Sequence, residues 1–84
     1  MIAAEPPRKR SVTIAGHETS IALEPVFWAA IERAAAEEKL PLNALIARID
    51  AQRLEQSPPA NLASAIRQWL FARQLRRLPD GGGE

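Results

Sequence analysis

Residues 16–28 read Gly-His-Glu-Thr-Ser-Ile-Ala-Leu-Glu-Pro-Val-Phe-Trp and contain two different hydrophobic periods. Up to Leu23 the side chains alternate between the two faces of an extended chain, which predicts a β-strand. One face carries Thr19, Ile21 and Leu23, and the other carries Glu18, Ser20 and Ala22. A helical pattern starts at Pro25, a residue that suits the first helical position. The stretch therefore predicts one short strand that leads directly into helices.

A lone strand has two unpaired edges and needs a partner. The strand and the first two helices cover only about forty residues, a size at which a chain rarely holds a core without a disulfide, a metal or oligomerisation. The sequence has no cysteine. We therefore expect an obligate homodimer in which the strand pairs antiparallel with its two-fold mate. The expected interface residues are Thr19, Ile21, Leu23, Trp28, Ile31, Leu45, Ile46 and Ile49.

The segment before this strand allows two interpretations. Residues 1–9 carry Pro6-Pro7 and basic side chains, and we expect a flexible basic arm. From Arg10 to Ile14 the side chains alternate again, so Ser11–Ile14 could form a hairpin with Thr19–Leu23 through a turn at residues 15–18. The alternative is an extended arm that leads to a single strand. The sequence does not decide between the two.

Two helices are expected in the core, which spans residues 10–57. The first begins at Pro25 and ends near Lys39, because Pro41 disfavours helix at Leu40. Its inward residues are Phe27 or Trp28, Ile31, Ala34 and Ala35. The second runs from about Leu42 to Gln56, before Ser57-Pro58-Pro59. Its inward residues are Leu42, Leu45, Ile46 and Ile49.

A third helix is expected within residues 58–78, after Asn61 as N-cap. Its inward stripe is Leu62, Ile66, Trp69 and Leu70, and a second stripe is Phe71, Leu75 and Leu78. We expect the cluster Arg73–Arg77 to remain solvated and residues 79–84 to be a disordered tail. The fold class is mainly α with a short β-ribbon.

Several kinds of site are not expected. His17 is the only histidine, so no zinc-ligand spacing exists, and we expect it to be a turn residue bonded to backbone. Ser20 has no neighbouring base, and the glycines at 81–83 do not form a phosphate loop. We expect no enzyme activity, cofactor or metal. Without an apolar run of about eighteen residues or a signal core, we expect a soluble, cytoplasmic protein.

Charge is distributed unevenly along the chain. Residues 18–38 carry five glutamates and one arginine, whereas residues 61–78 carry four arginines and no acid, and a second basic cluster lies at residues 8–10. This polarity suits a protein that meets an anionic partner through its basic ends. Equally, the charges could form ordinary solvated faces.

The order of strand, helix, turn and helix resembles the ribbon-helix-helix family of dimeric DNA-binding proteins. The resemblance is closest to a bacterial branch with the pattern Arg-Ser-x-x-Ile-x-Gly-His-x-Thr-Ser-x-x-Leu-Glu-x-x-Phe-Trp and a final helix similar to residues 61–67. It covers roughly residues 8–72. The matching positions are Arg10, Ser11, Ile14, Gly16, His17, Thr19, Ser20, Leu23, Glu24, Phe27 and Trp28.

The resemblance implies an intertwined homodimer plus a third C-terminal helix, with a ribbon that enters the DNA major groove. The implied base-reading residues are Glu18, Ser20 and Ala22. The implied phosphate-binding amides are those of Leu42, Asn43 and Ala44. Relatives usually place cationic or amide side chains, or threonine, at the reading positions, so here the cations would come from Arg8, Lys9 and Arg10.

Two functions follow as hypotheses. The first is a homodimeric DNA-binding protein that regulates transcription, with the ribbon on base edges and the arm on phosphates. The alternative is a protein–protein interaction module that keeps the dimeric scaffold and contacts another protein through its C-terminal helix. Salt-sensitive DNA binding would separate the two.

Overall fold

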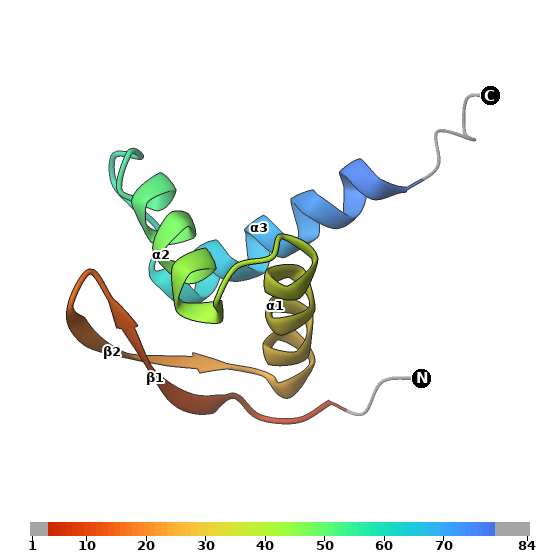
Figure 1. Cartoon of the computed structure of the whole chain (residues 1–84), viewed down its shortest axis with the longest axis horizontal. Helices are drawn as coiled ribbons and strands as arrows, with labels where there is room; N and C mark the ends of the chain where they lie inside the picture. The colour runs from red at the N-terminus through yellow and green to blue at the C-terminus, as the bar shows by residue number, and fades with distance from the viewer. Residues whose placement is uncertain (1–3, 79–84) are drawn as a thin grey trace.

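The computed structural model describes residues 4–78 and contains a two-stranded antiparallel β-ribbon followed by three helices (Figure 1). The predicted fold class, mainly α with a short ribbon and a third helix, is confirmed. The expected tail at residues 79–84 lies outside the described residues. The elements are β1 (Arg8–Ile14), β2 (His17–Leu23), α1 (Pro25–Glu37), α2 (Leu42–Arg53) and α3 (Leu62–Arg77).

The ribbon is a hairpin within one chain. Ile14 stands opposite His17, so the connection is the two-residue turn Ala15-Gly16. Both turn residues have positive φ, 52° and 82°, as a tight turn that matches the twist of its strands requires. The turn is thus shorter than expected, and His17 opens β2 instead of lying in the turn. β1 starts at Arg8, so the expected boundary between arm and ribbon moves from residue 10 to residue 8.

The expectation that the strand preceding α1 has no partner strand in its own chain is wrong. Arg8 to Val12 pair with Leu23 to Thr19, so β1 covers one edge of β2. The expected interface side chains other than Thr19 are buried within the single chain, and Ile21 is only 3% exposed. The reason is that residues 8–14 supply a second alternating segment, which the two-residue turn brings into register. Elements of one chain therefore cover the core of the described residues, and the homodimer stays a prediction.

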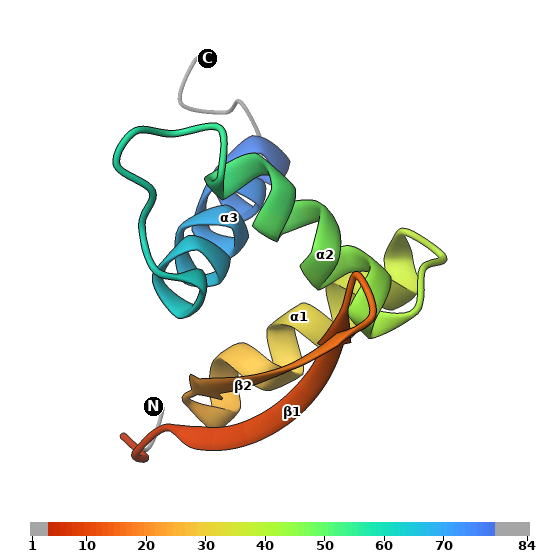
Figure 2. The same ribbon diagram turned by 90° about the vertical axis from the view of Figure 1, so that its left-hand side faces the viewer.

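The helices cover one face of the ribbon, and the core lies between them (Figures 1 and 2). The helix that follows the ribbon buries Trp28 and leaves Phe27 half-buried, and the Trp28 indole Nε1 donates to the Arg8 carbonyl oxygen at 2.9 Å. Ile66 is the fully buried side chain of α3. The buried residues are Val12, Ile14, Ile21, Leu23, Trp28, Ile31, Ala34, Ala35, Leu45, Ile46, Ile49 and Ile66.

Backbone conformation and hydrogen bonds near each terminus explain where the helices begin and end. α1 ends at Glu37, and Lys39 adopts a left-handed φ of 57° that reverses the chain. The amides of Lys39 and Leu40 then donate to carbonyls of the last turn of α1, which satisfies the helix C-terminus. α2 ends at Arg53, earlier than the expected Gln56. The predicted cap of α3 is confirmed, since Asn61 Oδ1 accepts from the Ser64 amide at 2.8 Å.

Candidate nucleic-acid interface

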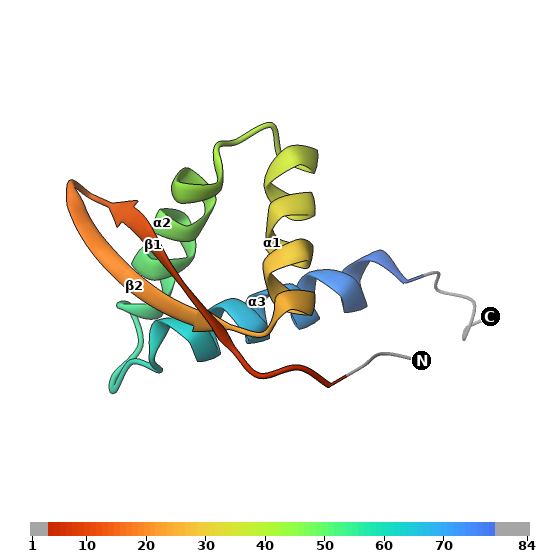
Figure 3. The ribbon, with the colours of Figure 1, turned by 90° about the horizontal axis from the view of Figure 1, so that it is seen from below.

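The ribbon has one face turned toward the helices and one turned to solvent. Alternation along each strand assigns the side chains, because successive residues point to opposite faces. The outer face consists of three cross-strand pairs in which Lys9 stands opposite Ala22, Ser11 opposite Ser20 and Thr13 opposite Glu18. All are exposed except Ala22, which is half-buried. Figure 3 shows the ribbon from below, with the two strands in front of the helices.

This outer face carries side chains of types that are able to hydrogen-bond to nucleic-acid bases. Ser11, Ser20 and Thr13 supply hydroxyls, Lys9 a cation and Glu18 a carboxylate. The three expected reading positions therefore lie together, and β1 adds three more side chains beside them. Sequence reasoning did not count Ser11 and Thr13, and it placed Lys9 on an arm. The alternation of Ser11 and Thr13 with Val12 and Ile14 was the signal that could have found them.

Arg10 does not lie on the outer face. It stands opposite the buried Ile21, and its guanidinium bonds to the Glu32 carboxylate at 2.9 Å. The same guanidinium lies 4.4 Å from the centre of the Trp28 ring. Arg8 shares this face of the ribbon, opposite Leu23. Of the three expected basic contacts, only Lys9 projects outward.

The N-terminus of α2 offers two backbone amides rather than three. Its N-cap is Pro41, which makes no side-chain capping bond, and the first turn contains no acidic residue. The Ala44 amide donates to the Pro41 carbonyl at 3.0 Å and is occupied. The amides of Leu42 and Asn43 have no acceptor within residues 4–78. These two groups keep the positive end of the helix dipole available to an anion.

The arginines of α3 are largely neutralised by acids of α1 and its flanks. Arg67 pairs with Glu24 at 3.0 Å, and Arg73 pairs with Glu37 at 2.9 Å and with Glu38 at 3.4 Å. Arg77 also bonds to Glu37. The expectation of a solvated cluster is therefore wrong for Arg73, whose side chain is only 15% exposed because the acidic helix packs beside it, whereas Arg77 stays exposed although it bonds to Glu37.

The pKa values of two carboxyl groups, those of Glu24 and Glu37, are lowered in this region. The backbone amide of Glu24 itself, and then Arg67, hold the pKa of the Glu24 carboxyl below its ordinary value. Arg77 and then Arg73 lower the pKa of the Glu37 carboxyl by hydrogen bonding. Both carboxyls therefore stay ionised at neutral pH and keep the α3 arginines engaged.

Other kinds of site have little support in the described structure. Within residues 4–78 no three His, Cys, Asp or Glu side chains gather in a way that would hold a metal ion. His17 is exposed at the start of β2. None of the described helices has the length and apolar character needed to cross a bilayer.

The fold and site define a small domain that presents a two-stranded β-ribbon, polar on its outer face, on a support of helices. The chain belongs to the ribbon-helix-helix domain family, whose profile matches residues 7–74 and so includes β1 and most of α3. Members of this family are typically DNA-binding transcription regulators that form homodimers, on a fold that is not an enzyme scaffold. No curated protein and no solved structure gives a significant match to the chain.

Proposed function

We propose that this protein is a homodimeric DNA-binding regulator of transcription whose ribbon enters the major groove. The observation that carries the proposal is the outer face of the hairpin, where all six side chains are polar or small. The opposite face of the hairpin packs against the helices in the hydrophobic core. A two-stranded ribbon fits the major groove, and hydroxyl side chains hydrogen-bond to base edges there. The typical role of the ribbon-helix-helix family, DNA-binding regulation of transcription, supports the same assignment.

The contacts divide by role. The paired Ser11 and Ser20 at the centre of the face read base edges, and Glu18 accepts from a cytosine amino group. Lys9 contacts phosphate or guanine at the rim. The amides of Leu42 and Asn43 hold a backbone phosphate, as helix N-termini do in general. Because Arg10 is engaged by Glu32, the basic contribution to DNA binding is smaller than the sequence suggested.

Dimerisation would double these contacts on a two-fold operator. The described sheet has two strands, so each strand keeps one edge without a neighbouring strand. Exposed strand edges pair readily with another chain. A second copy attached along such an edge would present its own outer face to the other half of the operator. Such a dimer joins two folded chains instead of sharing one core, since the core is already closed in each.

The test is binding to duplex DNA as a function of salt, with single-site variants. Each neutralised phosphate contributes about −0.9 to the slope of log K against log salt. Lys9→Ala should flatten the slope by about two units per dimer if both lysines contact phosphate. Ser20→Ala should change discrimination between sequences and leave the slope nearly unchanged. Glu18→Gln should tighten non-specific binding, because it removes an anion that faces the groove.

A matched control is Arg76→Ala. Arg76 is an exposed cation of α3 without an ion-pair partner in residues 4–78, and it lies off the ribbon. It should leave the salt slope unchanged. If wild type shows no salt-sensitive binding at low ionic strength, the DNA-binding proposal is refuted. If Arg76→Ala has the same effect as Lys9→Ala, the outer face of the ribbon is not the contact surface.

A further inference from the structure

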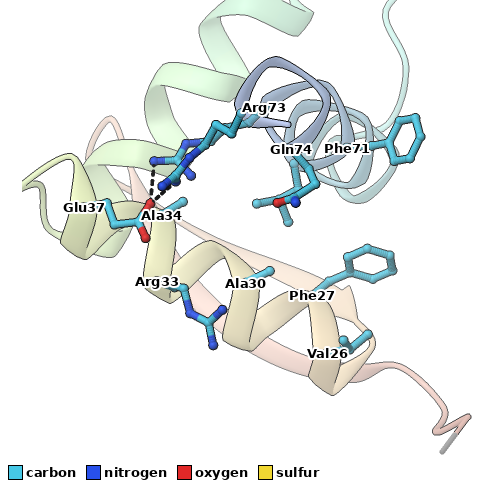
Figure 4. Close-up of a pocket in the computed structure, with 11 residues that line it drawn as sticks. Val26, Phe27, Ala30, Arg33, Ala34, Glu37, Phe71, Arg73 and Gln74 are labelled. Carbon is cyan, nitrogen blue, oxygen red and sulfur yellow. Dashed lines mark hydrogen bonds and ion pairs between the residues drawn. The ribbon is translucent and has the colours of Figure 1, made fainter. Parts of the chain in front are cut away.

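A groove of about 500 Å³ runs between α1 and α3. Figure 4 shows its two chemically different ends. Val26, Phe27 and Phe71 lie at one end, and Arg33, Glu37 and Arg73 lie at the other. All the residues that line it belong to α1 and α3, and none belongs to the ribbon. The groove is therefore separate from the candidate nucleic-acid interface.

Large apolar side chains at and near the apolar end of the groove are exposed to solvent. Phe71 is 66% exposed, Leu75 is 52% exposed and Val26 is 46% exposed. A second hollow shares Phe27 and Phe71 with this groove and extends the apolar surface to Leu75. Contiguous apolar surface of this kind, bordered by charges, is typical of a protein-binding site. The second apolar stripe that the sequence places on α3 thus has no partner within the described chain.

The charged end carries an excess of positive charge. Arg33, Arg73 and Arg77 line the groove there together with the carboxylate of Glu37, and Glu38, which does not line the groove, also pairs with Arg73. Glu37 is already shared by Arg73 and Arg77. Arg33 has no ion-pair partner among residues 4–78. An additional carboxylate from outside would therefore find favourable partners at this end.

We propose that this groove binds an amphipathic helix of another protein, with its apolar stripe on Phe27 and Phe71 and acidic side chains next to Arg33 and Arg77. A helix laid in an apolar groove between two helices is a common mode of recognition. The α3 helix of a second copy fits poorly, because residues 61–78 contain four arginines and no acid. The acidic α1 of a second copy already uses its own apolar stripe in its core. The partner can bind while the ribbon contacts DNA, since the two surfaces share no residue.

The experiment uses the full chain and two synthetic helical peptides that share one leucine stripe. One peptide carries glutamate beside the stripe, and the other carries lysine at the same positions. Fluorescence anisotropy should show saturable binding of the glutamate peptide, with the lysine peptide weaker by at least about tenfold. Phe71→Ser should weaken the glutamate peptide by at least about tenfold, because it removes an exposed aromatic anchor. Arg33→Glu should weaken the glutamate peptide and strengthen the lysine peptide.

Leu54→Ser is the matched control. Leu54 is as exposed as these residues, at 57%, but it follows α2 and does not line the groove. It should leave peptide binding unchanged. Circular dichroism and DNA binding of Phe71→Ser should match wild type, because the side chain lies at the surface and off the ribbon.

Equal affinity for both peptides, or glutamate-peptide binding that survives Phe71→Ser, would overturn the proposal. Absence of binding would also overturn it. In that case sedimentation can identify a different occupant: an oligomer that dissociates in Phe71→Ser would mean that a second copy fills the groove. These results are independent of DNA binding, so the two proposals can fail separately.

Discussion

Replacing Ile66 by alanine tests whether α3 is an integral part of the fold. The Ile66 side chain is fully buried, and it anchors a helix whose other apolar residues are only partly covered. The substitution removes three carbon atoms, worth about 2.4 kcal/mol of transfer free energy at about 0.8 kcal/mol each. The cavity left behind raises the expected loss in the free energy of unfolding to about 3 kcal/mol, within the usual range for such truncations. That loss is large beside the total stability of a domain of this size, about 4–13 kcal/mol.

The measurement is urea unfolding at one protein concentration, followed by tryptophan fluorescence and circular dichroism. In a thermal melt of the same samples, the midpoint temperature should fall by about 12–24 °C for a loss of about 3 kcal/mol. Leu75→Ala is the matched control, since it introduces alanine in the same helix at a site that is 52% exposed. It should change stability by no more than about 0.5 kcal/mol. A loss below about 1 kcal/mol for Ile66→Ala, or equal losses for both variants, would refute the packing of α3 on the core.

Three further predictions concern the turn, the ion pairs and the assembly. Ala15→Asn should raise the free energy of unfolding, measured in urea, by about 0.5–1 kcal/mol, because asparagine before Gly16 tolerates the positive φ better than alanine does. A lower free energy of unfolding would contradict a positive φ at residue 15. Glu37→Gln should lower stability at neutral pH, because the lowered pKa of this carboxyl stabilises the folded state above the ordinary glutamate pKa. This contribution disappears as the pH falls through the folded-state pKa, so titrated unfolding curves should converge in acid; a constant difference would argue against the pairs with Arg73 and Arg77. Finally, because the core closes within one chain, protein diluted until the dimer dissociates should keep its helical circular-dichroism signal and a cooperative melt, whereas unfolding on dissociation would show that two chains share the core.

The sequence by itself determined the kind and order of most elements, because these depend on local chemistry. Period-two alternation predicted the strand before α1, and Pro25 marked the start of that helix. Asn61 predicted the cap of α3 because an N-cap interaction spans only three residues. The inward stripes of α1 and α2 followed from helical periodicity alone, and so did the position of Ser20 on the solvent face of the ribbon.

The tertiary structure decided which strands pair and which charged side chains form ion pairs. Alternation in residues 10–14 was compatible with an arm or with a hairpin strand, and only the register with β2 selected the hairpin. The same pairing turned Arg10 toward Glu32 and Trp28, away from the outer face, although its charge alone suggested a phosphate contact. Likewise Arg73 is engaged by Glu37, 36 residues away in the chain. A sequence gives the charge and period of each segment, whereas contacts between distant segments depend on how those segments pack in three dimensions.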